Sequence, residues 1–419
     1  MFNKQEALKI QGEMRRILSE KIIPFWLARS VDSEYGGFLT SYDENGAPLG
    51  SDDKYLVTQC RMVWGFSNLQ KHARVQDAAA MKEAAAQGLA FLYDNFWDAE
   101  DGGFYWQTAR DGTPKDRAKL VYGESFAIYA LSEYALVYGD EKALGYAERL
   151  FDLLLSRAAD TLRGGFFENL ERDWRPSPAG AYAGDRKSLD IHMHLMEAFT
   201  TLYEAGRKEI HRRRLDEVAG LILGHMVNHQ HGYGYNQFDL SFNRLPAINI
   251  NRTWNAERET NETLAKPADT TSYGHNVELS WLLSRARKVL GLDEKTDIAA
   301  ALLDHSLRHG YDYEFGGVYR DGIGDGEALV TDKEWWQNFE ALAGYAHGYR
   351  LFKDDEYYGA FAGTWAFVRD KFLNLEAGES RQLLNRRGDT IIGNLGNPWK
   401  GIYHTGRALA ESICALQDI

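Results

Sequence analysis

A short phrase with two adjacent glycines recurs along the chain and constrains its fold more than any other feature. An acidic or aromatic turn, then Gly-Gly and an apolar residue, occurs at Asp32–Phe38, Asp98–Phe104, Leu162–Phe166 and Asp312–Val318, with a looser relative at His231–Tyr235. One supersecondary unit repeated around a common core is the simplest explanation of such a period. A closed ring of these units would gather one end of every inner helix at a single cavity. Polar residues at those helix ends would then define the chemistry.

The hydrophobic period between these phrases predicts about twelve helices, because apolar residues recur at i, i+3 and i+4 spacing. The expected helix starts lie near Lys4, Val57, Asp77, Leu120, Glu141, Ser188, Lys208, Tyr273, Lys295, Lys333, Asp355 and Gly401. Pro24 and several glycines fall between them as stop signals. The Gly-Gly phrases predict short β-hairpins in alternate connections. We therefore expect an all-α fold, an (α/α)6 barrel of about twelve helices with short β-hairpins in the connecting loops. An open helical solenoid is the alternative.

The bulk composition indicates one large domain. The chain has 419 residues, of which 44% are hydrophobic, and no linker rich in Pro, Ser or charge divides it. A single domain spanning residues 1–419 is therefore expected. The longest irregular stretch runs from Tyr233 to Thr271. A loop of that length in a compact domain is usually a functional lid or is disordered.

The charge and cysteine content exclude several classes of partner. A net charge of −13 argues against nucleic acid and against an anionic membrane surface. No apolar run is long enough to span a bilayer, and the N-terminus is an amphipathic charged segment rather than a signal peptide. Two cysteines, Cys60 and Cys414, suit a reducing, cytoplasmic location. An aromatic content of 13% suits a sugar-binding cleft, although plain core packing would explain it equally well.

Five helical segments carry pairs of functional residues near their starts. Each pair stands at i, i+3 or i, i+4 spacing, which places both side chains on one helix face. The pairs are Arg61/Trp64, Asp190/His194, His275/Glu278, Trp336/Glu340 and His404/Arg407. Any single pair could be structural, but a ring of helices would bring all of them together. A separation of two residues rotates a helix by about 200°, so one of His192 and His194 faces the centre and the other packs outward.

Signals for metals and nucleotides are weak. His225, His229 and His231 have a spacing that could ligate zinc, but no neighbouring Cys or HExxH motif supports it. A polar helix end is the favoured interpretation of these histidines. No GxSxG, Walker A or Rossmann glycine pattern occurs in a suitable context. We therefore expect neither a metal nor a cofactor.

Seven motifs together resemble the N-acylglucosamine 2-epimerase superfamily and, within it, the branch of cellobiose 2-epimerases and mannose 2-epimerases. They are EKIIPFW with DxExGGF, QCRMVWGFS, YGESFAIYALSEY, HMHLMEAFTTLY, SYGHNVELSWLL, WWQNFEALAGY and PWKGIYHTGRALAE. The resemblance covers nearly the whole chain and is specific in combination. It implies an (α/α)6 barrel, in agreement with the helix count.

The resemblance also implies catalytic roles. His275 and His404 correspond to the two histidines that act as acid and base at C2 of the sugar. His194 corresponds to a third histidine, associated with ring opening and substrate positioning. Arg61 corresponds to an arginine that binds substrate oxygens near C1 and C2. Glu278 corresponds to a carboxylate beside the first catalytic histidine.

Further pocket residues follow from the same resemblance. Trp336 and Trp399 correspond to the aromatic platforms of the family. Tyr122, Glu340 and Arg407 correspond to other conspicuous residues of the pocket. All five are expected to take part in binding the substrate.

Two departures from the cellobiose branch bear on the substrate. Asp190 stands where cellobiose epimerases have Asn in the motif NTHLH, and the segment between His194 and His275 is longer than in that branch. An added loop at the cavity mouth could block the place of a second sugar ring, and the new carboxylate could bind a hydroxyl of a small sugar. Both departures favour a monosaccharide, with D-mannose and D-glucose as the pair that is interconverted.

The chemistry explains why these residue types are needed. A C2 proton is acidic only when C1 is a free aldehyde, so the sugar ring must open first. Deprotonation then gives an enediolate, whose negative oxygen Arg61 could stabilise. Imidazole titrates near neutrality and can act as base or acid on either face. Reprotonation on the opposite face and ring closure complete a cofactor-independent epimerisation.

Alternatives within the family are a cellobiose 2-epimerase, which would make glucosyl-mannose, and a mannose aldose–ketose isomerase, which would return the proton to C1. An inverting glycosidase is an alternative of another class, with Asp190 and either Glu278 or Glu340 as its opposed carboxylates. A noncatalytic sugar-binding module is a further one. The expected partner is a small sugar, and the expected state is a monomer or a homodimer.

Overall fold

The computed structural model describes residues 2–253 and 268–418. Of the long irregular segment expected at Tyr233–Thr271, residues 254–267 lie outside the described part. The remainder of that segment is described and contains strands β8 to β11.

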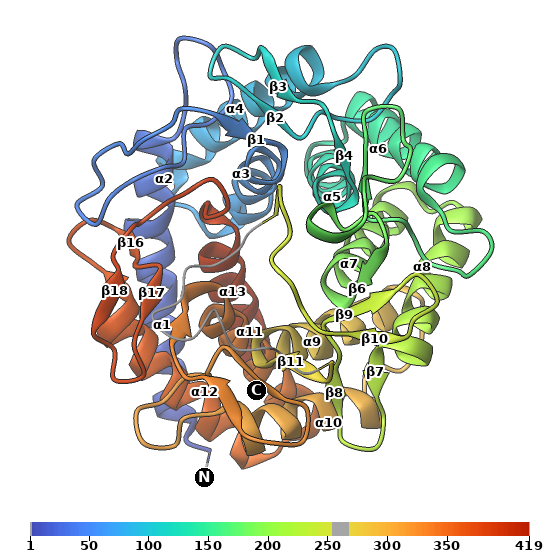
Figure 1. Cartoon of the computed structure of the whole chain (residues 1–419). Coiled ribbons are helices and arrows are strands. Elements are labelled where there is room, and N and C mark those ends of the chain that lie inside the picture. Colours follow the sequence, from blue (N-terminus) through green and yellow to red (C-terminus); the bar gives the residue numbers. More distant parts are fainter. Residues whose placement is uncertain (1, 254–267, 419) are drawn as a thin grey trace.

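Twelve helices of the described chain form an inner and an outer ring (Figure 1). The outer helices are α1 (Lys4–Ile17), α4 (Val75–Phe91), α6 (Glu141–Leu153), α8 (Glu209–Leu221), α10 (Asp297–His305) and α12 (Asp355–Phe367). The inner helices are α3 (Leu56–Asn68), α5 (Val121–Tyr138), α7 (Leu189–Gly206), α9 (Tyr273–Val289), α11 (Trp335–Phe352) and α13 (Ile402–Ala415). Each inner helix packs against the next, and α13 packs against α3 to close the ring. The expected (α/α)6 barrel is confirmed.

The inner helices are buried on nearly all sides, which explains their weak amphipathicity. In α3, for example, every residue from Leu56 to Ser67 is buried. A helix that is surrounded by other helices needs no polar face. Polar residues within these helices are therefore held by specific partners or belong to the site described below.

Each outer helix of the described chain ends in a five-residue π-helical turn. These turns are η1 (Leu18–Ile22), η3 (Leu92–Phe96), η4 (Leu154–Ala158), η6 (Ile222–Met226), η7 (Ser306–Gly310) and η8 (Val368–Phe372). The expectation that Pro24 stops the first helix is wrong. Turn η1 leads directly into α2 (Ile23–Arg29), with Pro24 at its second position. A proline is tolerated in the first turn of a helix because its missing N–H has no partner there in any case.

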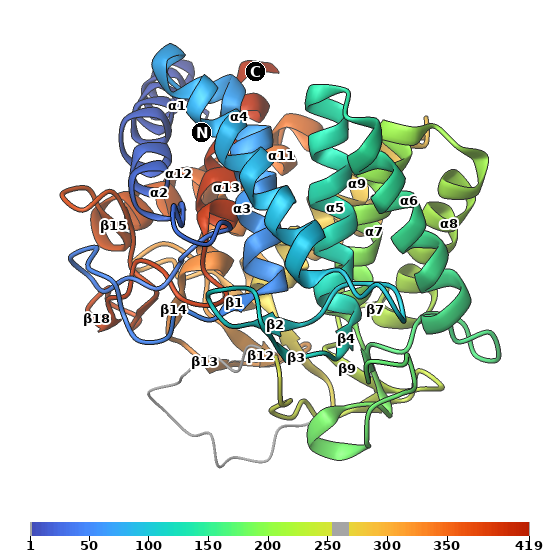
Figure 2. The same cartoon turned by 90° about the horizontal axis from the view of Figure 1, so that it is seen from above.

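Short antiparallel strands follow the turns, as the Gly-Gly phrases predicted. They are β1 (Lys54–Tyr55), β2 (Gln107–Thr108), β3 (Pro114–Asp116), β4 (Lys119–Leu120), β5 (Asn169–Leu170), β6 (Arg186–Ser188), β7 (Val227–Asn228), β8 (Tyr233–Gly234), β9 (Gln237–Asp239), β10 (Arg244–Leu245), β11 (Thr270–Ser272), β12 (Asp321–Ile323), β13 (Ala328–Val330), β14 (Lys333–Glu334), β15 (Leu373–Asn374), β16 (Glu379–Ser380), β17 (Leu383–Leu384) and β18 (Thr390–Ile392). They pair in the orders β1-β2-β3, β10-β9-β6, β11-β12-β13, β14-β17-β18, β15-β16, β4-β5 and β7-β8. The 3₁₀ turns are η2 (Leu69–His72), η5 (Gly180–Tyr182) and η9 (Leu416–Asp418). All the hairpins lie at one face of the barrel, which we call the hairpin face (Figure 2).

Buried ion pairs tie the Gly-Gly turns to the starts of four inner helices. In each, a lysine two residues before the helix binds the aspartate that opens the turn. The Nζ–Oδ2 distances are 2.9 Å for Lys54–Asp32, 3.2 Å for Lys119–Asp98, 2.9 Å for Lys187–Asp160 and 3.0 Å for Lys333–Asp312. We call these pairs the lysine clasps. They fix the height at which each inner helix begins.

A side chain of the inner helix holds the same turn from the other side. His192 lies in α7, and the Phe166 N–H donates to its Nε2 at 3.2 Å. Gly165 has φ +72°, and a Cβ there would lie 2.7 Å from His192 Nε2. Glycine is needed here because only it allows both the positive φ and this close approach. His192 is thus the histidine of its pair that packs outward.

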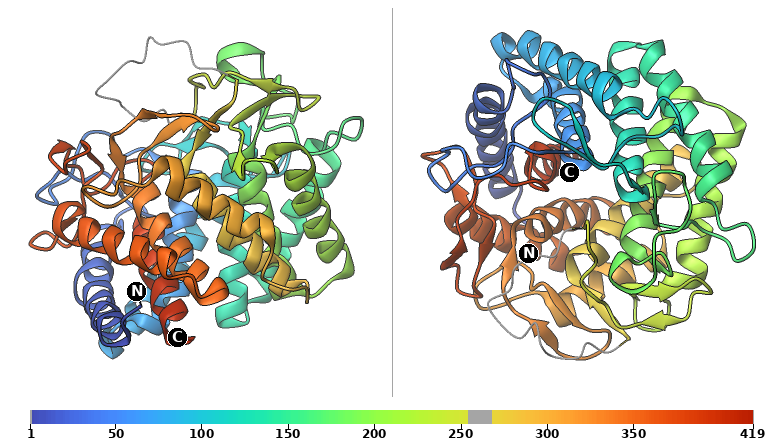
Figure 3. Two further views of the ribbon diagram at one scale, coloured as in Figure 1. Left: turned by 90° about the horizontal axis from the view of Figure 1, so that it is seen from below. Right: turned by 45° about the horizontal axis from the view of Figure 1, so that its top comes forward.

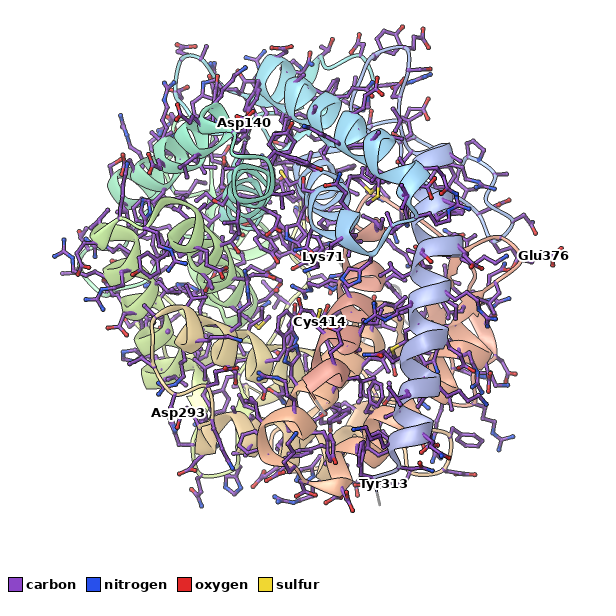
Figure 4. All side chains as sticks on the ribbon, turned by 180° about the vertical axis from the view of Figure 1, so that it is seen from behind. Lys71, Asp140, Asp293, Tyr313, Glu376 and Cys414 are labelled. Carbon is purple, nitrogen blue, oxygen red and sulfur yellow. The ribbon has the colours of Figure 1, made fainter. Side chains whose placement is uncertain are left out.

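The two ends of the described chain lie at the face opposite to the hairpins (Figures 2 and 3). Viewed from that rear face, Lys71 and Cys414 lie near the centre of the ring, whereas Asp140, Asp293 and Tyr313 lie at its rim (Figure 4). None of the described helices combines the length and the apolar character that crossing a membrane requires.

Candidate active site

The inner helices present residues to the barrel axis at equivalent positions near their starts. Each of these residues stands two positions after the side chain that binds the neighbouring Gly-Gly turn or its equivalent. The six axial residues are Arg61, Phe126, His194, Glu278, Glu340 and Arg407. The turn-binding residues that precede them are Gln59, Glu124, His192, Asn276, Asn338 and Thr405. Two residues rotate a helix by about 200°, so one set faces outward and the other faces the centre.

Asp190 joins two of the histidines. Its Oδ1 lies 3.3 Å from His194 Nε2 and 3.4 Å from His275 Nε2. Serine caps set these helix starts: Ser188 accepts from the Ile191 N–H, and Ser272 accepts from the His275 N–H. The side chains of Asp190 and His275 are 37% and 19% exposed. This part of the site is therefore accessible from the hairpin face.

The carboxylates favour the protonated form of these two imidazoles. Burial alone would lower the pKa of His194, but Asp190 and Glu197 raise it to about 9. Burial likewise opposes protonation of His275, and the Asp190 charge outweighs it, so the pKa of His275 is raised. Burial would raise the pKa of Asp190, yet His275 and His194 hold it well below its ordinary range. Both histidines are therefore potential proton donors at neutral pH.

His404 has the opposite electrostatic surroundings. Its Nδ1 lies 2.8 Å from Glu340 Oε1. Burial, followed by the positive charge of Arg61, lowers the pKa of His404 well below its ordinary value. A neutral ring that donates Nδ1–H to Glu340 carries its lone pair on Nε2. His404 is thus a potential base.

Arg407 lies between the carboxylates that serve these histidines. Its guanidinium donates to Glu197 and to Glu278, and it lies 2.7 Å from Glu340 Oε1. The Tyr403 hydroxyl donates to Glu197 at 2.9 Å. Burial would raise the pKa of Glu197, but Arg407 and His194 lower it to about 2.

Arg61 is the cation on the other side of the site. Its Nη1 donates to the Trp399 carbonyl and its Nη2 to the Tyr122 hydroxyl, both at 2.8 Å. The guanidinium carbon lies 4.4 Å from the ring centroid of Phe126. Arg61 Nε is buried and has no hydrogen-bond partner among the residues that the structure describes. These contacts fix the orientation of the planar group, which suits it to bind paired oxygens.

The two tryptophans occupy different parts of the site. The Trp336 ring centroid lies 4.6 Å from that of His275 and 5.8 Å from that of His404, so this ring contacts both imidazoles. Trp399 packs against Tyr55 and Trp106, at 5.0 and 5.8 Å between centroids.

Glu278, Glu340 and His404 form the one group in the described part of the chain whose ligand atoms are close enough to hold a metal ion, all within 4.8 Å of one another. Arg407 already places a positive charge against both carboxylates. The guanidinium thus supplies at this point the charge that a metal would otherwise bring. The histidines at 225, 229 and 231 do not form such a group.

All eleven residues predicted from the sequence belong to one connected set. Asp190 links His194 to His275, Trp336 links His275 to His404, and the chain of contacts continues through Glu340 to Arg407 and Glu278. On the other side, the Tyr122 ring lies 5.5 Å from that of His194 and its hydroxyl binds Arg61, which in turn contacts Trp399.

Sequence reasoning missed Glu197 and Tyr403. Glu197 stands three residues after His194, so the i, i+3 rule could have paired them. Tyr403 stands four residues before Arg407 and adjoins His404. Only the closed ring reveals that the tyrosine and the glutamate meet, because α7 and α13 lie opposite each other and these side chains bridge the centre.

Comparison with known proteins agrees with this geometry. The sequence profile of the family described as N-acylglucosamine 2-epimerase (GlcNAc 2-epimerase) matches residues 36–408. Cellobiose 2-epimerase of Bacteroides fragilis is 29% identical over 421 aligned residues, covering 96% of this chain and 98% of that protein. D-mannose isomerase of Marinomonas mediterranea is 24% identical, with 95% of each chain covered.

The fold is also found in solved structures. Cellobiose 2-epimerase from Spirochaeta thermophila has a TM-score of 0.85 and 27% sequence identity, and the match covers 99% of this chain and 98% of that one. The family profile spans most of the repeat units and includes every site residue from Arg61 to Arg407. The chain therefore belongs to the N-acylglucosamine 2-epimerase family and is an enzyme of the sugar 2-epimerase and isomerase class.

Proposed function

We propose that the enzyme interconverts D-mannose and D-glucose by epimerisation at C2, with the whole chain acting as one catalytic domain. The observation that carries this proposal is the arrangement of His275 and His404 against the ring of Trp336. His275 is bound to a carboxylate that favours its protonated form, and His404 is neutral and has a free Nε2 lone pair. An acid and a base beside one aromatic platform are what proton exchange at a single carbon requires.

The residues support the following sequence. His194, bracketed by Asp190 and Glu197, donates a proton to the ring oxygen while the C1 hydroxyl releases its proton to water, which breaks the bond from C1 to the ring oxygen and gives the aldehyde. His404 Nε2 then removes the C2 proton, and Arg61 stabilises the negative oxygen of the enediolate. His275 delivers its proton to the other face of C2. On ring closure the attacking hydroxyl returns its proton to His194, and the C1 oxygen takes up a proton from water. His404 then loses its extra proton to water and His275 regains one from water, so both are ready for the next turnover without a cofactor.

The preference for a single sugar ring is supported by a segment at the hairpin face. Residues 246–253 run from the end of β10 across the front of the barrel towards α3 and α5 (Figure 1). Arg252 anchors this segment, which we call the strap. Arg252 Nε lies 2.7 Å from Asp116 Oδ2, and Arg252 Nη1 lies 3.3 Å from Glu171 Oε1. The guanidinium carbon lies 5.0 Å from the Tyr182 ring centroid.

The strap has further attachments along its length. Arg186 donates to the Pro246 carbonyl at 2.9 Å, and the Asn251 N–H donates to the Ala181 carbonyl at 2.7 Å. A segment tied down in this way limits the room beyond the reacting ring. The Asp190 carboxylate, which is exposed to the same face, supplies an acceptor for a hydroxyl of that ring.

Aldose–ketose isomerisation is the second candidate. It uses the same enediolate and differs only in returning the proton to C1. A relative named D-mannose isomerase favours it, because its similarity to this chain covers 95% of both proteins. Cellobiose epimerisation is the third candidate, since the Bacteroides fragilis and Spirochaeta thermophila relatives carry that name.

One experiment separates these candidates. The enzyme is incubated with mannose, glucose and cellobiose separately in heavy water, and products are followed by NMR. We expect deuterium at C2 and a higher kcat/KM for mannose and glucose than for cellobiose. Fructose as the main product would replace epimerisation with isomerisation, and a preference for cellobiose would refute the single-ring assignment. No exchange at either carbon would refute the proposed function.

The remaining expectations follow the same proposal. The enzyme acts on a free sugar of carbohydrate metabolism in the cytoplasm, as a monomer or a homodimer. The acidic composition and the two cysteines, which are not joined to each other, support that location.

A further inference from the structure

Two histidines on different sides of the site are held by the same device. His194 Nδ1 lies 2.9 Å from Glu197 Oε2, and His404 Nδ1 lies 2.8 Å from Glu340 Oε1. In each pair a carboxylate accepts from Nδ1, so Nε2 is the ring nitrogen that can exchange a proton with substrate, and in His194 that nitrogen also lies 3.3 Å from Asp190 Oδ1. The two carboxylates come from α7 and α11, and both bind the same guanidinium, that of Arg407.

Arg407 itself is shielded from the hairpin face. Its side chain is 1% exposed, and the Tyr403 and Trp281 rings lie 4.2 and 5.0 Å from its guanidinium carbon. Trp281 Nε1 also donates to Glu340 Oε2 at 3.3 Å. The arginine therefore acts behind the histidines rather than beside the substrate.

We propose that Arg407 is a positioning residue that couples the two histidine–carboxylate pairs, holding Glu197 and Glu340 at once so that His194 and His404 both keep Nε2 for the substrate. The expected contribution of Arg407 to turnover rests on the proposed epimerisation. The coupling itself is a property of the side chains in the unliganded enzyme.

The charge balance gives the physical reason. Glu197, Glu278 and Glu340 converge on one guanidinium, whose planar fork can bind several carboxylate oxygens in fixed directions. Burial, together with the neighbouring Glu340 charge, raises the pKa of Glu278, and Arg407 opposes that rise. Without the guanidinium, the carboxylates would repel one another. Glu340 would then lose its fixed position against His404 Nδ1.

The direction of the effect on His404 can be worked out from its neighbours. The charged groups that face it are Arg61, His194, Glu278, Glu340 and Arg407. Arg407 disfavours the imidazolium form, so its removal raises the pKa of His404. The base would then be lost by protonation at a higher pH than in the natural enzyme.

The test uses Arg407→Gln and Arg407→Lys in the full-length enzyme, with two readouts. The first is the pH profile of kcat/KM, whose acid limb should move upward by about one pH unit or more in the Gln variant. Its kcat/KM at neutral pH should fall about a hundredfold or more. The Lys variant keeps the charge but not the fork, so its shift should have the same sign and be smaller.

The second readout does not depend on activity. Nitrogen-15 NMR of the histidine side chains should show His404 protonated at Nδ1 and bare at Nε2 at pH 7 in the natural enzyme. That signature should change in both variants. Arg285→Met is the matched control, because Arg285 lies on inner helix α9 and donates to Thr201 and Glu204 away from the site. It should change neither readout.

The outcomes are distinct. An unchanged acid limb with an unchanged His404 signature in either variant that folds would overturn the coupling, even if activity fell equally at every pH. If the Gln variant does not fold, the Lys variant alone tests the coupling. A natural enzyme without epimerase activity would refute the proposed epimerisation. The nitrogen-15 comparison would still decide the role of Arg407.

Discussion

At the residue scale, burial opposes protonation of all three imidazoles, and the charges beside each ring decide whether that effect is overcome. His194 and His275 adjoin Asp190, and both have raised pKa values. His404 adjoins Glu340, but the positive charges of Arg61 and Arg407 also face it, and its pKa is lowered. Histidine side chains thus provide both the proton donors and the proton acceptor at one pH.

The Asp190→Asn variant should shift the pH dependence in a definite direction. The carboxylate favours protonated His194 and His275, so its loss lowers both pKa values. The alkaline limb of kcat/KM, where the proton donor is lost, should therefore move to lower pH by about one unit or more. Steady-state rates between pH 5 and 10 would measure this, with Asp173→Asn, an exposed aspartate, as the control. A limb that stays in place would mean that Asp190 does not set the donor.

Replacing His404 or His275 by Ala should reduce C2 exchange by about 10²–10⁴-fold, the usual contribution of a positioned acid or base. Deuterium incorporation at C2 measures the loss, and circular dichroism shows that the helices are retained. His229→Ala is the control, because His229 is exposed and binds only the Leu223 carbonyl in the described part of the chain. Near-normal exchange in either site variant would remove that histidine from the proposed pair.

The sequence predicted the histidines and both cations, because their spacing and motifs are visible in one dimension. It did not predict Glu197 or Tyr403. A glutamate within a helix usually indicates a solvated face, and only its i, i+3 spacing from His194 distinguishes Glu197 locally from such a residue. Its role arises from packing across the ring, where the partner Arg407 lies 210 residues away in sequence. Long-range charge pairing of this kind has no sequence period.

At the element scale, the lysine clasps explain why the Gly-Gly phrases precede the site-bearing helices. Each clasp binds a turn to a helix start through a lysine and an aspartate that are almost fully buried. The sequence predicts these turns wherever the phrase contains two glycines. The sixth turn, Asn374–Glu379, was missed because it contains only Gly378. The helix stop predicted at Pro24 does not occur. The π-helical turn η1 before it, which has no simple sequence signal, continues the chain directly into α2.

Lys187→Met should lower the free energy of unfolding by about 1.5–3 kcal/mol, because it removes the buried cation of Asp160 and leaves the partly exposed Arg163, 3.4 Å away, beside that carboxylate. Urea denaturation followed by circular dichroism would measure the change. Lys115→Met provides the comparison, since Lys115 also binds an aspartate, Asp53, but is 48% exposed. That exposed pair should contribute less than about 1 kcal/mol. Equal effects in the two variants would show that the clasp is not a principal anchor of its helix.

At the scale of the whole molecule, the ring brings six helix starts to one face and the strap crosses that face. Arg252→Ala removes the contacts with Asp116 and Glu171 and should loosen the strap without altering the histidines. The ratio of kcat/KM for cellobiose to that for mannose should then rise about tenfold. Initial rates with both sugars give this ratio. Arg175→Ala, which removes an exposed pair with Asp173, should leave it unchanged. An unchanged ratio in the Arg252 variant would mean that the strap does not select the substrate.

The position of the chain ends has a practical consequence. Both ends of the described chain lie at the rear face, across the full depth of the barrel from the hairpins (Figures 2 and 3). A tag fused at either end would project away from the strap and from the partly exposed Asp190. The enzyme could therefore be tethered to a bead or a column by its N- or C-terminus with the reactive face turned outward, ready for a sugar solution that flows past it.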